Sequence, residues 1–205
     1  QAKHLHVFQR TANFSLEARN APMDPERERR HKADYPAHRD AANDTPFGMS
    51  GHPPPDKSAL EVSADERDQI YERKWEQGGS VSFLFAFNDL LTNKASNDTA
   101  SDFARKKIRH KVNDPEVADL LTPTTHPIGT KRLILDTNYY ETYNRDNVKL
   151  VDVRKAPIKR ITSNGVKTQD AEYEFDVIIY ATGFDAVSGP LTRMDIRGEG
   201  GQTFK

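Results

Sequence analysis

Two short groups of cationic residues offer the clearest chemistry in this sequence. Lys131 and Arg132 follow a Pro-Ile-Gly-Thr loop and precede an apolar run, where two cations bind phosphate or stabilise an anion. Arg10 and Thr11 follow an alternating apolar stretch near the start of the chain. At the tip of the second strand of a dinucleotide-binding unit, an arginine meets the adenosine ribose, and its planar fork suits a 2′-phosphate. For both groups, a solvated surface position is the alternative.

A third group is the small-residue turn Ala181-Thr182-Gly183, which is followed by Asp185. The turn follows residues 177–180 (VIIY), which are β-branched or aromatic and carry no charge. Such a run is typical of a strand buried on both faces of a parallel sheet. Open α/β sheets bind ligands at the carboxyl ends of their strands, and small residues let the backbone approach a bulky cofactor. An ordinary tight turn after a buried strand is the alternative.

The elements that must position these groups are strands on both sides of a helical block. We predict strands over residues 4–9, 148–153 and 172–180, a short apolar run at 133–135, and a hairpin over 158–168 that turns at Ser163-Asn164-Gly165. Residues 47–55 are expected to form a loop, and residues 81–91 a buried helix, with a strand as the alternative.

Local capping signals place the helices of the block. Asp24-Pro25 and Asp114-Pro115 each combine an N-cap with proline at the first helical position, and the second helix should run through Leu121. Ser63 and Glu66 have capping-box spacing, which predicts a helix to about residue 77, ended by Gly78-Gly79. Residues 97–112 repeat apolar side chains at helical spacing. We expect Trp75, Phe83, Phe85 and Phe87 to be core residues, and residues 26–32 to form a solvated helix face.

The composition excludes several classes of function. The chain has 205 residues with 30 basic and 31 acidic side chains, so it has no general attraction to nucleic acid or anionic membranes. It has no cysteine, which removes disulfides, thiolate catalysis and cysteine-based metal sites. No apolar run approaches the roughly 18 residues of a membrane span. The seven histidines do not group as ligands, so we predict no metal, and we expect a cytoplasmic protein.

Four blocks of sequence resemble the class B flavoprotein monooxygenases of the Baeyer–Villiger type, the group of cyclohexanone and phenylacetone monooxygenases. The blocks are residues 4–11 (HLHVFQRT), 86–91 (AFNDLL) with 97–100 (NDTA), 126–132 (HPIGTKR) running on through 136–148 (DTNYYETYNRDNV), and 176–191 with 195–198 (DIRG). They cover nearly the whole chain in order, and the last two are long and specific. One departure is Ala12, where the family usually has proline.

The resemblance implies an α/β fold: a fragment of a flavoprotein with two dinucleotide-binding, Rossmann-like domains and a helical insertion. It assigns residues 1–20 and 126–181, the latter with a β-meander, to the NADPH-binding domain, 21–125 to the helical insertion, and 182–205 to a truncated crossover into the FAD-binding domain. None of the 11 glycines builds a GxGxxG. We therefore expect an internal piece of a longer protein, inactive by itself.

The resemblance also implies an activity and roles for the residues. The family uses FAD, NADPH and O2 to make a flavin peroxide, and inserts one oxygen atom next to a ketone carbonyl to give an ester or lactone. It makes Arg132 the catalytic cation that stabilises the anionic peroxyflavin, and Lys131 a contact to NADP. With the family, Arg10 and Thr11 become the ligands of the 2′-phosphate end of NADPH.

The remaining assignments and alternatives also depend on the resemblance. Ala181, Thr182, Gly183 and Asp185 become the hinge between the two domains, touching flavin or nicotinamide cofactor. Tyr139, Tyr140 and Asn144 either support the active site or are core aromatics and a turn. Three rival functions stay open: a related flavin monooxygenase that oxygenates nitrogen or sulfur, a steroid-type Baeyer–Villiger branch, and a non-catalytic nucleotide-binding module that keeps the fold.

Overall fold

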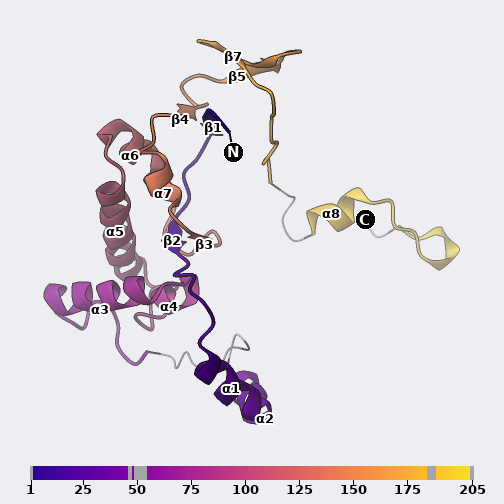
Figure 1. Ribbon diagram of the computed structural model, residues 1–205. Helices are drawn as coiled ribbons and strands as arrows, with labels where there is room; N and C mark the ends of the chain where they lie inside the picture. Colours follow the sequence, from indigo (N-terminus) through magenta and orange to yellow (C-terminus); the bar gives the residue numbers. More distant parts are fainter. Residues whose placement is uncertain (1, 46–47, 49–54, 184–187, 204–205) are drawn as a thin grey trace. The chain divides into compact units, whose positions relative to one another are not determined.

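The described part of the chain comprises residues 2–45, 48, 55–183 and 188–203 of a computed structural model (Figure 1). The chain divides into two compact units, Gln1–Ala156 and Pro157–Lys205. The predicted loop at 47–55 lies almost wholly outside the described residues. Among the described residues, no helix has both the length and the apolar character needed to cross a membrane.

Two parallel strand pairs join the ends of the first unit. Strand β1 (Leu5–Gln9) pairs with β4 (Val148–Asp152), in a register that sets Gln9 beside Asp152, and both predicted strands are confirmed. Strand β2 (Ser15–Glu17) pairs with β3 (Ile134–Asp136), where the apolar run at 133–135 is found. No sequence pattern indicated β2, because three residues are too short to show an alternation.

The capped helices form where their caps predict them. Helix α3 (Ala64–Gln77) begins where the Ser63 hydroxyl accepts a hydrogen bond from the Glu66 amide, and it ends at Gly78. Helix α6 (Pro115–Leu121) is capped by Asp114. Helix α5 (Lys94–Lys111) begins about one turn before the predicted stretch, because the Asn93 side chain accepts from the Ala95 and Ser96 amides.

The predicted helix at residues 81–91 is wrong beyond its first half. Helix α4 (Ser80–Leu84) ends early, and turns follow it. The Asn88 amide donates to the Lys57 carbonyl at 3.0 Å, and the Asn88 side chain donates to Asp56. These bonds to a distant segment compete with the bonds that a continuing helix would make, so tertiary contacts override the local apolar pattern.

The core of the first unit is an aromatic cluster between α3, α4 and α5. Tyr71, Trp75, Phe83, Phe87 and Phe103 pack with ring centroids 5.4–6.0 Å apart for the pairs that touch. Trp75, Phe83 and Phe87 are buried, as expected for core residues, whereas Phe85 is half-buried. On α5, the predicted apolar stripe is buried through Ala100, Ala104 and Ile108.

Two charged helices and a short one complete this unit. Helix α1 (Pro25–Ala33) begins at its predicted Asp24 cap and has no buried residue, which confirms the solvated face. Helix α2 (Tyr35–Asn43) follows it directly. Helix α7 (Tyr139–Thr142) follows β3 and packs against α5.

The second unit begins with a small antiparallel sheet. Strands β5 (Ile158–Ile161), β6 (Gly165–Thr168) and β7 (Glu172–Glu174) form a meander that confirms the predicted hairpin. Gly165 is required there, because a Cβ at this position would lie 1.8 Å from the Tyr173 carbonyl oxygen. A short helix, α8 (Gly189–Arg193), and a 3-10 turn (Glu199–Gly201) follow later in the unit.

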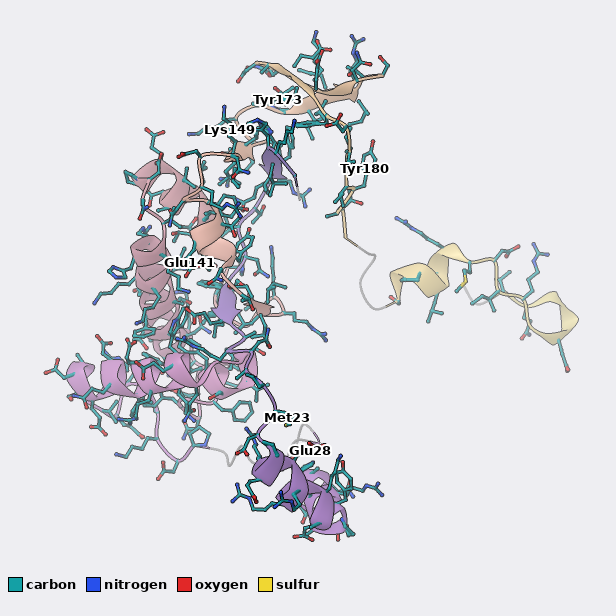
Figure 2. All side chains as sticks on the ribbon, in the orientation of Figure 1. Met23, Glu28, Glu141, Lys149, Tyr173 and Tyr180 are labelled. Atoms are coloured by element: carbon teal, nitrogen blue, oxygen red, sulfur yellow. The ribbon has the colours of Figure 1, made fainter. Side chains whose placement is uncertain are left out.

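The predicted buried strand at residues 172–180 is wrong after Glu174. Val177, Ile179 and Tyr180 are 74%, 83% and 66% exposed, and Tyr180 projects from an extended stretch (Figure 2). A strand needs a neighbour for its backbone hydrogen bonds and cover for its two faces. Among the described residues of this unit, none forms a strand ladder with residues 176–180, so their composition alone does not make them a strand.

Candidate functional site

The carboxyl ends of β1 and β4 meet at one edge, because the two strands are parallel. Arg10 and Thr11 follow β1 directly, and the Val153 amide donates to the Gln9 carbonyl at 3.1 Å just beyond β4. The Gln9 side chain donates to the Leu120 carbonyl at 2.8 Å, which ties the strand end to α6. Arg154, after β4, lines a small hollow together with Thr11. This edge is where an α/β fold binds a ligand.

The charges at this edge leave Arg10 available to a ligand. Arg10 is exposed, and its side chain makes no hydrogen bond or ion pair within the described ranges. Arg154 is held instead by Asp152, whose carboxylate accepts from the Arg154 amide at 2.9 Å and from its guanidinium at 3.3 Å. Burial raises the pKa of the Asp152 carboxyl, but the hydrogen bonds and charge of Arg154 outweigh this and lower it. Asp152 therefore stays ionised and neutralised by its own neighbour.

Lys131 and Arg132 stand at the end of a tightly bonded loop. The Thr130 amide and hydroxyl both donate to the Pro127 carbonyl, at 3.4 and 2.8 Å. Gly129 has φ +88°, a left-handed conformation that favours glycine, and a Cβ there would lie 2.9 Å from a Leu91 methyl. Lys131 and Arg132 are both exposed, and their side chains have no hydrogen-bond or ion-pair partner among the residues that the structure describes.

Asn13 links the segment after β1 to the loop that carries Lys131 and Arg132. Its side-chain amide donates to the Arg132 carbonyl at 3.1 Å, and its side-chain oxygen accepts from His126 at 3.1 Å. Asn13 therefore bridges both ends of the loop that carries Lys131, and it lies only three residues after Arg10. Residues separated by 119 positions in the sequence are thus fixed next to each other.

The surroundings of His126 are cationic. Its pKa is lowered by burial first, and then by the positive charges of Lys131 and Arg105. Its ring lies edge-on to Phe14 at 5.6 Å, and the Arg105 guanidinium lies over the same Phe14 ring at 5.8 Å while pairing with Asp102. Lys131 has no ion-pair partner among the described residues, and an uncompensated positive charge favours an anionic ligand.

Of the tyrosines expected to be either active-site supports or core residues, Tyr140 is a core residue and Tyr139 is exposed. Tyr140 is buried, accepts a hydrogen bond from the Ser15 amide at 3.1 Å and donates to the Asn13 carbonyl at 3.5 Å, so it holds the segment that carries the bridge. Burial raises the pKa of Tyr140, which keeps its hydroxyl protonated. Tyr139 contacts Tyr143 through its hydroxyl. Asn144 belongs to a turn, where it bonds the end of α5.

The predicted hinge residues lie in the second unit. Ala181, Thr182 and Gly183 are exposed and extended, and Gly183 has φ +85° with open space around it. Asp185 lies outside the described residues. Of the residues predicted for the site, Arg10 and Thr11 lie at the end of β1, and the backbone of Arg132 is bonded to Asn13, three residues after Arg10.

Several members of the site carried no sequence signal of their own. Asn13 and Arg105 are single polar residues in unremarkable surroundings, and only their long-range contacts reveal a role. Arg154 follows a strand whose partner was not known from the sequence. His126 had a signal, since it precedes the loop that leads to Lys131. Across the described ranges, no cluster of three histidine, aspartate or glutamate side chains is arranged to hold a metal ion.

Comparison with known proteins decides the family. No family model matches the chain. A 2-oxo-Delta(3)-4,5,5-trimethylcyclopentenylacetyl-CoA monooxygenase of Pseudomonas putida is 50% identical over 198 residues, which are 97% of this chain and 36% of the relative. A Baeyer–Villiger monooxygenase of Pseudooceanicola batsensis is 41% identical over 208 residues, or 100% of this chain and 37% of that protein. The crystal structure of OTEMO in complex with FAD and NADP matches with a TM-score of 0.92 and 48% identity, over 99% of this chain and 37% of that one. The chain belongs to the Baeyer–Villiger-type flavoprotein monooxygenases.

This Baeyer–Villiger-type chain spans about 37% of the length of the relatives that it matches. The resemblance carried by its four sequence blocks and the expected α/β flavoprotein fold are both confirmed. The family resemblance also extends to a phenazine N-monooxygenase of Lysobacter antibioticus, which is 39% identical over 206 residues.

The residues of this Baeyer–Villiger-type chain fit a dinucleotide phosphate. The exposed side chains of Arg10, Lys131 and Arg132 supply only hydrogen-bond donors and positive charge, and the exposed Thr11 hydroxyl supplies a further donor. A phosphate group needs such a donor set. The fit for FAD is weaker, because no GxGxxG occurs in the chain.

Proposed function

We propose that this chain forms part of an FAD- and NADPH-dependent Baeyer–Villiger monooxygenase that inserts one oxygen atom of O2 next to a ketone carbonyl, giving an ester or lactone. The observation that carries the proposal is the presence of two exposed cationic groups, Arg10 and Lys131-Arg132, whose side chains have no ion-pair partner among the described residues. Asn13, three residues after Arg10, bonds the backbone of Arg132. The relatives named as Baeyer–Villiger monooxygenases, and the related structure with FAD and NADP, support the same activity.

The proposal gives each cation a separate task. Arg10, with Thr11 beside it, binds the 2′-phosphate of NADPH through its planar fork. Lys131 contacts the cofactor as a compact charge. Arg132 supplies a guanidinium that stabilises negative charge developing on the oxygen to be transferred. When bound, NADPH supplies the reducing equivalents and FAD supplies the activation of O2.

The domain assignment belongs to the same proposal. Residues 1–20 and 126–181 form part of the NADPH-binding domain, residues 21–125 the helical insertion, and residues 182–205 the crossover to the FAD-binding domain. Ala181, Thr182, Gly183 and Asp185 then lie at the hinge between the domains. The 205-residue chain alone is inactive under this proposal, and the whole protein works in the cytoplasm, where NADPH is regenerated.

The test is Arg132→Ala in the full-length protein that contains this chain. Oxygenation of a cyclic ketone should fall by a factor on the order of 10² or more, as for the loss of one electrostatic stabiliser. Reduction of the flavin by NADPH should persist, because Lys131 and Arg10 remain. Arg145→Ala, which removes an exposed arginine from the turn before β4, is the matched control. Oxygenation that survives Arg132→Ala would refute the role of Arg132.

A second candidate function is oxygenation of nitrogen, favoured by the relative that is named a phenazine N-monooxygenase. Product analysis of the full-length enzyme with cyclic ketones and with aromatic amines separates the two. A non-catalytic nucleotide-binding module is disfavoured, because both Lys131 and Arg132 are retained and neither is used to stabilise the fold.

A further inference from the structure

The positions of Lys131 and Arg132 depend on their backbone, because their exposed side chains make no hydrogen bond or ion pair among the described residues. The preceding loop contains no regular secondary structure. Its fixed point is Ile128, whose side chain is fully buried. Only Gly129 and Thr130 lie between Ile128 and Lys131, so a shift of Ile128 is passed on to both cations.

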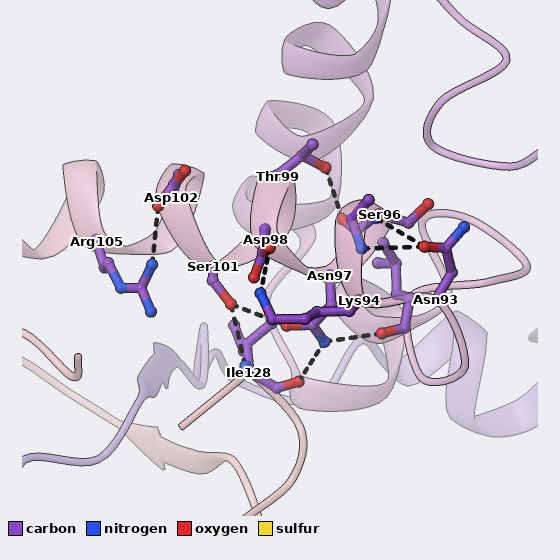
Figure 3. A network of polar contacts seen from close by, with 12 residues as sticks. Asn93, Lys94, Ser96, Asn97, Asp98, Thr99, Ser101, Asp102, Arg105 and Ile128 are labelled. Carbon is purple, nitrogen blue, oxygen red and sulfur yellow. Dashed lines mark hydrogen bonds and ion pairs between the residues drawn. The ribbon is translucent and has the colours of Figure 1, made fainter. Parts of the chain in front are cut away.

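Asn97 and Ser101 of α5 hydrogen-bond to the carbonyl and the amide of Ile128, respectively (Figure 3). The Asn97 amide donates to the Ile128 carbonyl at 2.8 Å. The Ile128 amide donates to the Ser101 hydroxyl at 3.1 Å. Asn97 and Ser101 are four residues apart, so they lie on the same face of the helix, one turn from each other.

The side chains of Asn97 and Ser101 also bond each other, and the polar atoms of both are hydrogen-bonded within the protein. The Ser101 hydroxyl donates to the Asn97 side-chain oxygen at 3.0 Å, and the second N–H of Asn97 donates to the Leu90 carbonyl at 2.8 Å. Asn97 is 5% exposed and Ser101 is 0% exposed. A buried network with every member satisfied holds a single geometry, because any movement leaves a buried group without its partner.

The opposite side of the loop is equally constrained. A Cβ at Gly129 would lie 2.9 Å from a Leu91 methyl and 3.1 Å from a Leu84 methyl. The backbone of the loop therefore packs closely against these two leucines. Leu90, beside Leu91, is itself bonded to Asn97. The loop is therefore held between the face of α5 and the turn after α4.

We propose that Asn97 and Ser101 are positioning residues for the reaction: they fix the Lys131-Arg132 pair relative to α5 without touching cofactor or substrate. This inference rests on the proposed function. Helix α5 is a suitable base, because it has 18 residues, a capped start and a buried stripe in the core. Misplacement of a catalytic group by about 1 Å costs on the order of 10²-fold in rate, so a small displacement of Ile128 has a measurable effect.

The experiment compares Ser101→Ala with Ser82→Ala in the full-length protein. Each change removes one buried hydroxyl, but the Ser82 hydroxyl bonds only the Gln77 side chain, at 2.9 Å. For Ser101→Ala we expect kcat/KM with NADPH and ketone to fall by roughly 10- to 100-fold, with more NADPH oxidised per product formed. Ser82→Ala should leave both quantities unchanged, and Ser101→Thr, which restores the hydroxyl, should recover them.

Hydrogen exchange of the Ile128 amide separates positioning from simple stability. It should accelerate in Ser101→Ala and not in Ser82→Ala, because only Ser101 accepts from this amide. Faster exchange with unchanged kcat/KM and unchanged coupling would overturn the positioning role and leave the proposed function standing. If the unmodified protein oxidised no NADPH with any ketone, the proposed function would fail, and this inference with it.

Discussion

The Asp89 carboxylate joins three segments of the helical block, and its replacement by asparagine should be costly. One oxygen accepts from the Ala59 amide at 3.1 Å. The other accepts from the hydroxyls of Ser58 and Ser96, at 2.7 and 2.5 Å, and from the Asn93 side-chain amide at 3.2 Å. Each of these four partners acts as a donor, so two acceptor oxygens are needed at this position.

An asparagine at position 89 has a single acceptor oxygen, so it can accept from only one of the two groups of donors that now bond the two Asp89 oxygens. The less damaging orientation places its NH2 group against the Ala59 amide, which removes one bond to a charged acceptor and leaves a buried donor unpaired, a loss of about 1.5–3 kcal/mol. The remaining bonds become neutral, and each is weaker by up to about 1 kcal/mol. We therefore expect Asp89→Asn to lower the free energy of unfolding by roughly 3 kcal/mol near neutral pH.

The same loss should depend on pH. Burial raises the pKa of Asp89, but the hydrogen bonds from Ser96, Ser58 and Ala59 outweigh burial, so the pKa of the folded protein lies below its ordinary value. The folded state then binds fewer protons than the unfolded state between the two pKa values. The contribution of Asp89 is complete above about pH 4, the unfolded pKa, and disappears as the pH falls through the lower folded value.

Urea unfolding of the 205-residue chain, followed by the fluorescence of its single tryptophan, Trp75, measures both effects. Asp98→Asn is the control, since Asp98 lies on α5, the helix that carries Ser96, and its ion pair with Lys94 is on the surface. It should change the free energy of unfolding by less than about 1 kcal/mol. The reasoning about Asp89 is refuted if Asp89→Asn costs no more than this control. It is refuted equally if its cost is the same in acid, well below pH 4, as at neutral pH.

Two further predictions concern the charged residues of the first unit. Arg10→Ala in the full-length protein should raise the KM for NADPH by roughly 10- to 100-fold and leave that for NADH unchanged, because NADH has no 2′-phosphate; an equal effect on both cofactors would contradict the role of Arg10. Lys111→Met should raise the pKa of Glu17 in an NMR titration, because burial already raises it and the hydrogen bond and charge of Lys111 are what lower it. An unchanged pKa of Glu17 would show that its ion pair with Lys111 is not formed in solution.

The elements that could be predicted from the sequence are those whose causes are local. The caps at Asp24, Ser63 and Asp114 satisfy amides two or three residues away, so the helix starts follow from short stretches of sequence. The alternation before Arg10 indicated β1 in the same way. The family could be recognised because its blocks are long and occur in order.

What could not be predicted depends on distant partners. The apolar residues 177–180 have the composition of a buried strand, but burial requires neighbouring strands, and the sequence of a segment does not say whether it has them. The hydrogen bond from the Asn13 side chain to the Arg132 carbonyl joins residues 119 positions apart in the sequence. No periodic pattern in the sequence indicates such a contact. The hydrogen bond from Asn97 to the Ile128 carbonyl could not be predicted from the sequence for the same reason.

The pairing of β1 with β4 has a consequence for the order of folding. It brings Leu5 beside Val148, so almost the whole first unit lies between the two strands. Closing so long a loop in an unfolded chain costs entropy before any strand contact repays it. The helices between them, with their local caps and aromatic core, shorten that loop once they have formed. We therefore expect the edge formed by β1 and β4 to assemble last, only after the helical block has folded.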